Sequence, residues 1–141
     1  FAIGAARYDD GQPESDLDAR IMLEVQINAQ PVRAMIDTGA PFVVLDPELA
    51  EALDYQSWEL TEDARLWVRD VRYEGTLHRV EVLLVAERGE SHSVSATIFV
   101  PRLRPGDAWG RKPNFIGLSL LDRIRYAIDP SVNTFYFGPL T

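Results

Sequence analysis

The sequence of 141 residues contains no cysteine, and only one of its 14 basic residues, Lys112, is a lysine. The lack of cysteine excludes disulfides, thiolate catalysis and zinc–thiolate sites. No apolar run approaches the ~20 residues that a membrane-spanning helix needs. The net charge of −8 argues against nucleic-acid binding, which calls for a basic face. What remains is the composition of an ordinary globular protein, with 46% hydrophobic and 26% charged residues.

The two ends of the chain suggest a simple domain organisation. Residues 1–18 are polar and acidic, and we expect a flexible N-terminal arm there, followed by one domain over 19–141. No signal peptide or membrane segment is visible, so a cytoplasmic location is favoured. Because the chain begins at Phe1, a leader or anchor could have been removed, and Phe1 could mark a self-processed end.

The most informative stretch is a mostly apolar run that ends in Asp37-Thr38-Gly39-Ala40 and is followed by a second apolar run. A carboxylate at the end of a buried strand is costly unless it is hydrogen-bonded or shares a proton. Gly39 permits a tight turn and close approach of another group, and Thr38 supplies a small hydroxyl. The pattern predicts that Asp37 is a catalytic carboxylate, supported by the loop Thr38, Gly39 and Ala40.

Hydrophobic patterning around this stretch predicts a mostly β fold with one or two short helices. Strict alternation predicts a strand over 19–28, a turn over 28–30 and a strand from Pro31 to Asp37. Asp46 and Pro47 predict a helix N-terminus, with the helix ending near Leu53. Further expected elements are a hairpin over 64–85 that turns at 71–75, a strand over 94–100 stopped by Pro101, a basic loop over 101–113, a helix over 118–124 and a last hairpin over 125–138.

A second signature lies about seventy residues after Asp37, at Asn114-Phe115-Ile116-Gly117 before the short helix. Together with the Asp-Thr-Gly-Ala motif, it resembles the retropepsin-like aspartic proteases over about residues 21–138. The resemblance implies a single-domain acid protease barrel whose flap hairpin covers the substrate. It also implies an aspartic endopeptidase acting on a protein or peptide, with water activated between two Asp37 carboxylates of a homodimer and no cofactor. In this interpretation Phe115, Ile116 and Gly117 are structural.

Three departures from the retroviral pattern qualify this resemblance. Retroviral enzymes carry an acid where this chain has Pro41 and an arginine where it has Leu118, so both members of a charge pair are absent. Retroviral flaps are also rich in glycine at the tip, whereas this hairpin offers Gly75 alone. The chain is therefore more similar to cellular, bacterial-type members. Possible flap contacts to substrate are Val71, Arg72, Tyr73 and Gly75.

Two alternatives stay open on sequence grounds. One is a catalytically silent retropepsin-fold protein that serves as a dimerisation or peptide-binding module; the other is a monomeric β domain in which Asp37 is a hydrogen-bonded turn residue. Dependence of activity on Asp37 tests the first, and mass in solution tests the second. His78 and His92 lack a metal-ligand spacing, so we expect no metal site and place both on exposed strand and turn positions.

Overall fold

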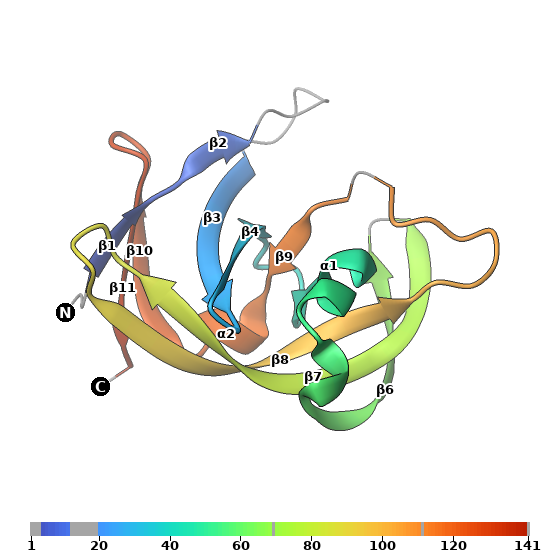
Figure 1. The fold of residues 1–141 in the computed structure, drawn as a ribbon. Helices are drawn as coiled ribbons and strands as arrows, with labels where there is room; N and C mark the ends of the chain where they lie inside the picture. The colour runs from blue at the N-terminus through green and yellow to red at the C-terminus, as the bar shows by residue number, and fades with distance from the viewer. Residues whose placement is uncertain (1–3, 12–19, 69, 111, 141) are drawn as a thin grey trace.

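The computed structural model describes residues 4–11, 20–68, 70–110 and 112–140. Strands dominate these residues, with two short α-helices and one 3-10 turn (Figure 1). In chain order the elements are β1 (Gly4–Arg7), β2 (Asp9–Gly11), β3 (Arg20–Ile27), β4 (Gln30–Ile36), β5 (Val43–Val44), α1 (Pro47–Ala52), η1 (Tyr55–Ser57), β6 (Glu59–Val68), β7 (Val71–Val85), β8 (Ser91–Arg102), β9 (Asn114–Ile116), α2 (Leu118–Leu121), β10 (Ile124–Asp129) and β11 (Thr134–Pro139).

Six strands close into a barrel. The larger sheet has the order β2-β3-β4-β9-β5-β8-β7-β6, and an additional pairing of β3 with β7 joins its two sides. This pairing sets Gln26 opposite Leu83 and Ile27 opposite Val82. The predicted mostly β fold with one or two short helices is therefore confirmed.

The N-terminal stretch differs from the expectation of a loose arm. β1 pairs antiparallel with β11, and β2 pairs antiparallel with β3. β1, β11 and β10 form a separate three-stranded sheet in which Ala6 is buried. Backbone pairing and the burial of Ala6 hold residues 4–11 against the fold, despite the polar composition of the region. Residues 1–3 and 12–18, also assigned to the arm, lie outside the described residues.

Two apolar clusters make the core. The larger one fills the barrel and includes Leu23, Ile98 and Phe135. The smaller one lies where the β6–β7 hairpin meets β5 and β9, and its buried members are Val44, Val68, Tyr73, Leu77, Phe99, Trp109 and Phe115. Met35 and Phe42, which flank the Asp37 loop in the sequence, pack against this smaller cluster. It therefore connects the hairpin with the Asp37 loop.

The helices are short and begin as the sequence predicts. The Asp46 carboxylate accepts a hydrogen bond from the backbone N–H of Glu48 at 2.8 Å, and Pro47 occupies the first turn of α1. α2 begins after Gly117 but ends at Leu121, three residues before the expected end. Among the described residues, no helix is both long enough and apolar enough to cross a membrane.

β8 is longer than expected and continues through Pro101 to Arg102. Proline lacks the N–H that a central strand position needs, so the sequence indicated a stop there. β5 pairs with β8 at Ile98 and Phe99 and no further, however, so that side of β8 is an edge by the time the strand reaches Pro101. On its other side, Pro101 lies opposite Gly75 of β7.

Candidate active site

Asp37 lies at the end of β4, and a neighbouring strand fixes its position. β4 runs parallel to β9, with Met35 opposite Phe115 and Ile36 opposite Ile116. One residue further on, the backbone N–H of Asp37 donates to the carbonyl of Ile116 at 2.9 Å. The two sequence signatures, distant in the sequence, therefore lie on adjacent strands, and the ends of these strands position Asp37.

The loop after Asp37 holds the carboxylate by local hydrogen bonds. The backbone N–H of Gly39 donates to Asp37 Oδ1 at 2.9 Å, and the N–H of Ala40 donates to the Asp37 carbonyl at 3.2 Å. Thr38 and Gly39 are exposed, and Asp37 is half-buried. A Cβ added at Gly39 would lie 3.2 Å from Asp37 Oδ1, so this position keeps space beside the carboxylate. The loop thus orients a charged group and leaves it accessible.

Gly117 lets the second signature approach the Asp37 loop closely. A Cβ at this position would lie 2.2 Å from the carbonyl oxygen of Phe42 and 2.4 Å from that of Ala40. Both obstacles are backbone atoms, which cannot swing aside as a side chain can. The close approach brings the N–H of Leu118 to within 2.8 Å of the Ala40 carbonyl.

Backbone hydrogen bonds connect the segments where the retroviral charge pair would lie. The N–H of Ser119 donates to the Pro41 carbonyl at 2.9 Å, beside the bond from Leu118 to Ala40. The departures at Pro41 and Leu118 thus occur in two segments that remain in contact. Neither position leaves a buried charge without a partner.

Sequence reasoning did not identify the polar side chains that brace this loop. The Ser119 hydroxyl donates to the Thr97 carbonyl at 2.6 Å and accepts from the N–H of Val43 at 3.0 Å. The Asn114 side chain accepts from the N–H of Asp46 at 2.7 Å and donates to the Arg33 carbonyl at 3.0 Å. The place of Asn114 at the start of the second signature was the only available signal, since its partners are distant in sequence.

The β6–β7 hairpin, called here the flap hairpin, spans residues 59–85 and corrects the expected turn. β6 ends at Val68 and β7 begins at Val71, so residues 71–75 belong to β7 and do not form the turn. Gly75 is a buried strand residue, and a Cβ there would lie 2.2 Å from the Val100 carbonyl oxygen. Glycine at this position allows close packing against β8. It is not needed for a turn, because the backbone here has no positive φ.

The expected flap residues lie on both faces of this hairpin. Side chains alternate along a strand, so Tyr73 and Gly75 face the smaller cluster while Arg72 and Glu74 face away from it. Val71 is exposed beside the connection. The structure therefore does not bring Val71, Arg72, Tyr73 and Gly75 together in one contact set.

Trp109 packs beneath the flap hairpin and belongs to the segment 101–113, which the sequence predicts as a basic loop. Its side chain is 4% exposed and its ring centroid lies 5.3 Å from that of Tyr73, which is 2% exposed. The Tyr73 hydroxyl donates to the Ala108 carbonyl at 3.1 Å. The ammonium of Lys112 lies over both rings, at 5.6 Å from Tyr73 and 5.8 Å from Trp109. A lone Trp among Pro, Gly and Arg residues was the sequence signal for this contact.

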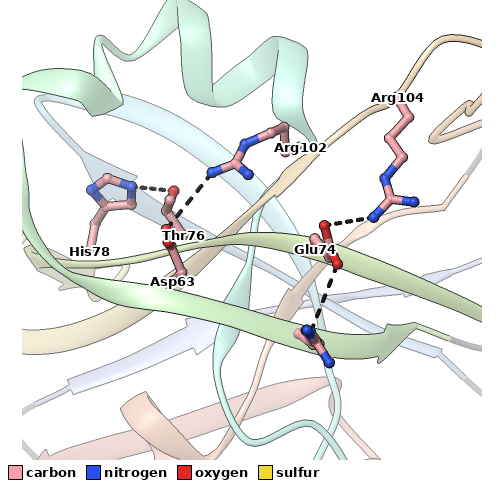
Figure 2. Close-up of polar contacts among 7 residues, drawn as sticks. Asp63, Glu74, Thr76, His78, Arg102 and Arg104 are labelled. Carbon is pink, nitrogen blue, oxygen red and sulfur yellow. Dashed lines mark hydrogen bonds and ion pairs between the residues drawn. The ribbon is translucent and has the colours of Figure 1, made fainter.

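The opposite face of the flap hairpin carries arginines arranged around one carboxylate (Figure 2). Arg104 binds Glu74 at 2.6 Å, and Arg65 lies 3.8 Å from the same side chain. The hydrogen bond from Arg104 and its positive charge lower the pKa of Glu74, and the same hydrogen bond with the negative charge of Glu74 raises the pKa of Arg104. Glu74 is therefore ionised at neutral pH and fixes the loop after β8 to the hairpin.

His78 is buried, so the expectation of an exposed strand position is wrong. It is 4% exposed, with ring centroids 5.2 Å from Tyr55 and 6.4 Å from Trp58. Its Nε2 lies 2.7 Å from the Thr76 hydroxyl (Figure 2). Burial disfavours the charged imidazolium and lowers the pKa of His78. His92 also differs from the expected turn position, since it is a half-buried residue within β8.

The described residues contain no group of three or more His, Asp or Glu side chains that could hold a metal ion. The chemistry that the Asp37 loop can offer is that of an accessible, backbone-anchored carboxylate. Such a group can accept or donate a proton, or orient a water molecule.

Comparisons with known proteins agree with this geometry. The family model of gag-polyprotein putative aspartyl proteases matches residues 23–123, which contain both signatures and the flap hairpin. A retropepsin-like aspartic protease from Rickettsia conorii is similar in structure, with a TM-score of 0.58 and 17% identity over 94% of this chain and 87% of that chain. The EIAV protease complexed with the inhibitor HBY-793 has a TM-score of 0.52 and 17% identity over 74% of this chain and 88% of that chain. No curated protein sequence is significantly similar to this chain.

Proposed function

The chain belongs to the family of gag-polyprotein putative aspartyl proteases, and on this premise we propose that it is an aspartic endopeptidase that works as a homodimer. Asp37 is the proposed catalytic residue, and Thr38, Gly39 and Ala40 form its supporting loop. The single observation that carries the proposal is the accessible Asp37 carboxylate, anchored by Gly39 and positioned by the second signature.

The number of carboxylates argues for the dimer. Aspartic proteolysis uses two carboxyl groups that face one another, and this sequence contains one Asp-Thr-Gly motif and no Asp-Ser-Gly motif. A twofold axis through the Asp37 loop would supply the second group from an identical chain. The exposure of Thr38 and Gly39 fits a loop that meets its symmetry mate. Thr38 would then hydrogen-bond across the axis, as the family resemblance implies.

The proposed reaction divides two proton transfers between the paired carboxyls. The ionised Asp37 takes a proton from a water molecule, whose oxygen attacks the carbon of the scissile amide. The protonated Asp37 of the partner subunit donates its proton to the carbonyl oxygen, which gives a neutral tetrahedral diol. Collapse of the diol breaks the C–N bond: the carboxyl group that is now protonated gives its proton to the leaving nitrogen, and the ionised one takes a proton from a diol hydroxyl as the C=O bond reforms. Because one proton must be shared, activity should fall when both carboxyls are protonated and when both are ionised.

The peptide would bind as an extended strand between the Asp37 loops and the flap hairpins, which would exclude water from the reacting bond. Val71, beside the hairpin connection, is exposed and available for such contacts. Tyr73 is packed against Trp109, so a direct substrate contact from Tyr73 would require this pair to separate.

One observation favours a second candidate function, a catalytically silent dimerisation or peptide-binding module. Trp109 of the same chain fills space beneath the flap hairpin, in the cluster that reaches Phe42 and Phe115. A hairpin held in this way would be less free to close over a peptide. The two functions differ in their dependence on the Asp37 carboxyl group.

The deciding experiment measures cleavage of a mixed peptide library by the wild type, by Asp37→Asn and by Asp122→Asn. Asp122 is exposed, follows α2 and provides the same chemical change away from the loop. Each protein is assayed across acidic and neutral pH at two concentrations. Cleavage that Asp37→Asn abolishes and Asp122→Asn retains, with specific activity that rises with concentration, would support a shared dimer site. Absence of cleavage by folded wild type, or equal cleavage by Asp37→Asn, would reject the peptidase proposal.

A further inference from the structure

The face of the flap hairpin that points away from the smaller cluster contains a hollow of about 410 Å³. We call it the arginine hollow, and its lining residues are Arg65, Arg72, Glu74, Arg102, Arg104 and Asp107. Four positive and two negative side chains therefore line a small concavity on a protein whose net charge is −8. A positive site on an acidic chain indicates an anionic ligand, because the rest of the surface would repel one.

Three of the four arginines have hydrogen-bond donors to spare. Arg104 makes a short contact with Glu74, at 2.6 Å. Arg65 lies 3.8 Å from Glu74 and Arg102 lies 3.8 Å from Asp63, too far for hydrogen bonds (Figure 2). Within the described parts of the chain, Arg72 has no ion-pair partner within 4.0 Å. Each guanidinium offers five N–H groups in a planar fork that matches a carboxylate.

The arginine hollow is separate from the proposed catalytic cleft. Arg72 and Glu74 alternate along β7 with Tyr73 and Gly75, so the two pairs lie on opposite faces of the strand. The face with Tyr73 packs against the smaller cluster, which includes Phe115 of the second signature. The hollow is therefore on the far side of the hairpin from the Asp37 loop. A ligand bound in it would not compete directly with a peptide at Asp37.

An exposed aromatic side chain borders the charged groups. Trp67 is 66% exposed and lies directly opposite Arg72 in the β6–β7 register, so both side chains project from the same face. Exposed Trp beside several Arg side chains is suited to a ligand that combines carboxylates with an apolar group. An acidic polypeptide segment has this combination, and a free inorganic anion does not.

We propose that the arginine hollow and Trp67 form a docking site for an acidic polypeptide segment that carries an apolar residue next to its carboxylates. The carboxylates bind Arg72, Arg102 and Arg65, and the apolar residue packs on Trp67. Nucleic acid fits less well, since a long polyanion would extend past the hollow onto an acidic surface that includes Asp63 and Asp70. This binding goes beyond the proposed peptidase activity and does not require it.

The test uses the full chain with Asp37→Asn, so that the probe is not cut and failure of the peptidase proposal cannot be mistaken for failure of docking. The probe is a fluorescein-labelled peptide of repeated Glu-Glu-Leu units, and its Gln-Gln-Leu counterpart is the uncharged control. Binding is measured by fluorescence anisotropy at low and high ionic strength. We expect saturable binding of the acidic probe that weakens with salt, and no binding of the uncharged probe.

Three protein variants locate the site. Arg72→Gln with Arg102→Gln should weaken binding by about tenfold or more, because charge-assisted hydrogen bonds to the probe are lost. Arg88→Gln with Arg123→Gln removes the same charge from two exposed positions elsewhere and should change binding by less than about twofold. Glu74→Gln should strengthen binding, because it releases Arg104 and Arg65 from their carboxylate partner.

The outcomes separate the proposal from its rivals. Equal weakening by the two arginine pairs would show a response to net charge alone and would overturn the site. Undiminished binding on Arg72→Gln with Arg102→Gln, or no binding of the acidic probe to a folded protein, would also overturn it. Tighter binding of a single-stranded oligonucleotide, or displacement of the probe by an equal concentration of inorganic phosphate, would assign the hollow to a different ligand.

Discussion

The close approach of Gly117 to the Asp37 loop makes Gly117→Ala an informative perturbation. The added Cβ would be placed 2.2 Å from the Phe42 carbonyl oxygen and 2.4 Å from that of Ala40. Gly117 has φ −106° and ψ −165°, an extended conformation that alanine also adopts. The cost is therefore steric and does not come from the backbone dihedral angles.

The size of the effect follows from two contributions and one offset. Overpacking against well-packed atoms costs about 1–3 kcal/mol. Relief of the clash would separate the segments and weaken the bonds from Leu118 to Ala40 and from Ser119 to Pro41, each contributing about 0.5–1.5 kcal/mol. Alanine also lowers the conformational entropy of the unfolded chain, which raises the free energy of unfolding by about 0.4–1 kcal/mol. We expect Gly117→Ala to lower the free energy of unfolding by about 1–5 kcal/mol.

Urea unfolding followed by circular dichroism measures this change, at one fixed protein concentration because dimerisation would shift the midpoint. Gly39→Ala is the matched control, since its Cβ would meet only the Asp37 carboxylate, at 3.2 Å. We expect Gly39→Ala to change the unfolding free energy by less than about 1 kcal/mol. An unfolding midpoint for Gly117→Ala equal to that of the wild type would contradict the predicted clash, because it would show that the Ala40–Phe42 backbone moves freely.

Two further predictions concern the flap hairpin. Trp109→Ala should lower the free energy of unfolding by about 3–5 kcal/mol, because it empties a buried aromatic site. Trp67→Ala at an exposed site is the control and should change the free energy of unfolding by less than about 0.5 kcal/mol. Equal effects of the two substitutions in chemical denaturation would contradict the assigned burial. Burial lowers the pKa of His78 below its unfolded value of about 6.5. The neutral His78 side chain therefore contributes fully to stability above that pH, and this contribution is lost as the pH falls towards the folded-state pKa. His78→Phe should therefore reduce the loss of unfolding free energy between pH 7 and lower pH, and an unchanged slope would contradict this sign.

Much of the candidate site was predictable because the two signatures are local patterns. The Asp-Thr-Gly-Ala turn places a backbone N–H beside the carboxylate, and the Phe115–Gly117 signature requires a strand and then a residue without a side chain. Alternation from Ile21 to Ile27 likewise predicts β3, since one face of that strand is buried in the barrel. These features depend on backbone conformation and side-chain period, which a sequence carries directly.

Errors occurred where long-range contacts override local preference. The polar composition of residues 4–11 indicates a loose arm, but pairing with β11 and β3 satisfies their backbone and makes strands. Gly75 looked like a hairpin tip, whereas its lack of a Cβ serves packing against Val100. His78 looked exposed because nothing nearby in the sequence shows that Tyr55 and Trp58 cover it.

The amino-acid sequence is sufficient to predict the β-rich character and the candidate carboxylate, because these depend on residue type, period and motif, and its single Asp-Thr-Gly motif is the basis for proposing a dimer. Which residues share a surface depends on the tertiary structure. Two such arrangements are Trp109 beneath Tyr73 and the arginines around Glu74. Their side chains come from strands and a loop, and the directions of these side chains are fixed only when the strands pair in the sheet. Register sets those directions, and strand pairing, a long-range property, sets the register.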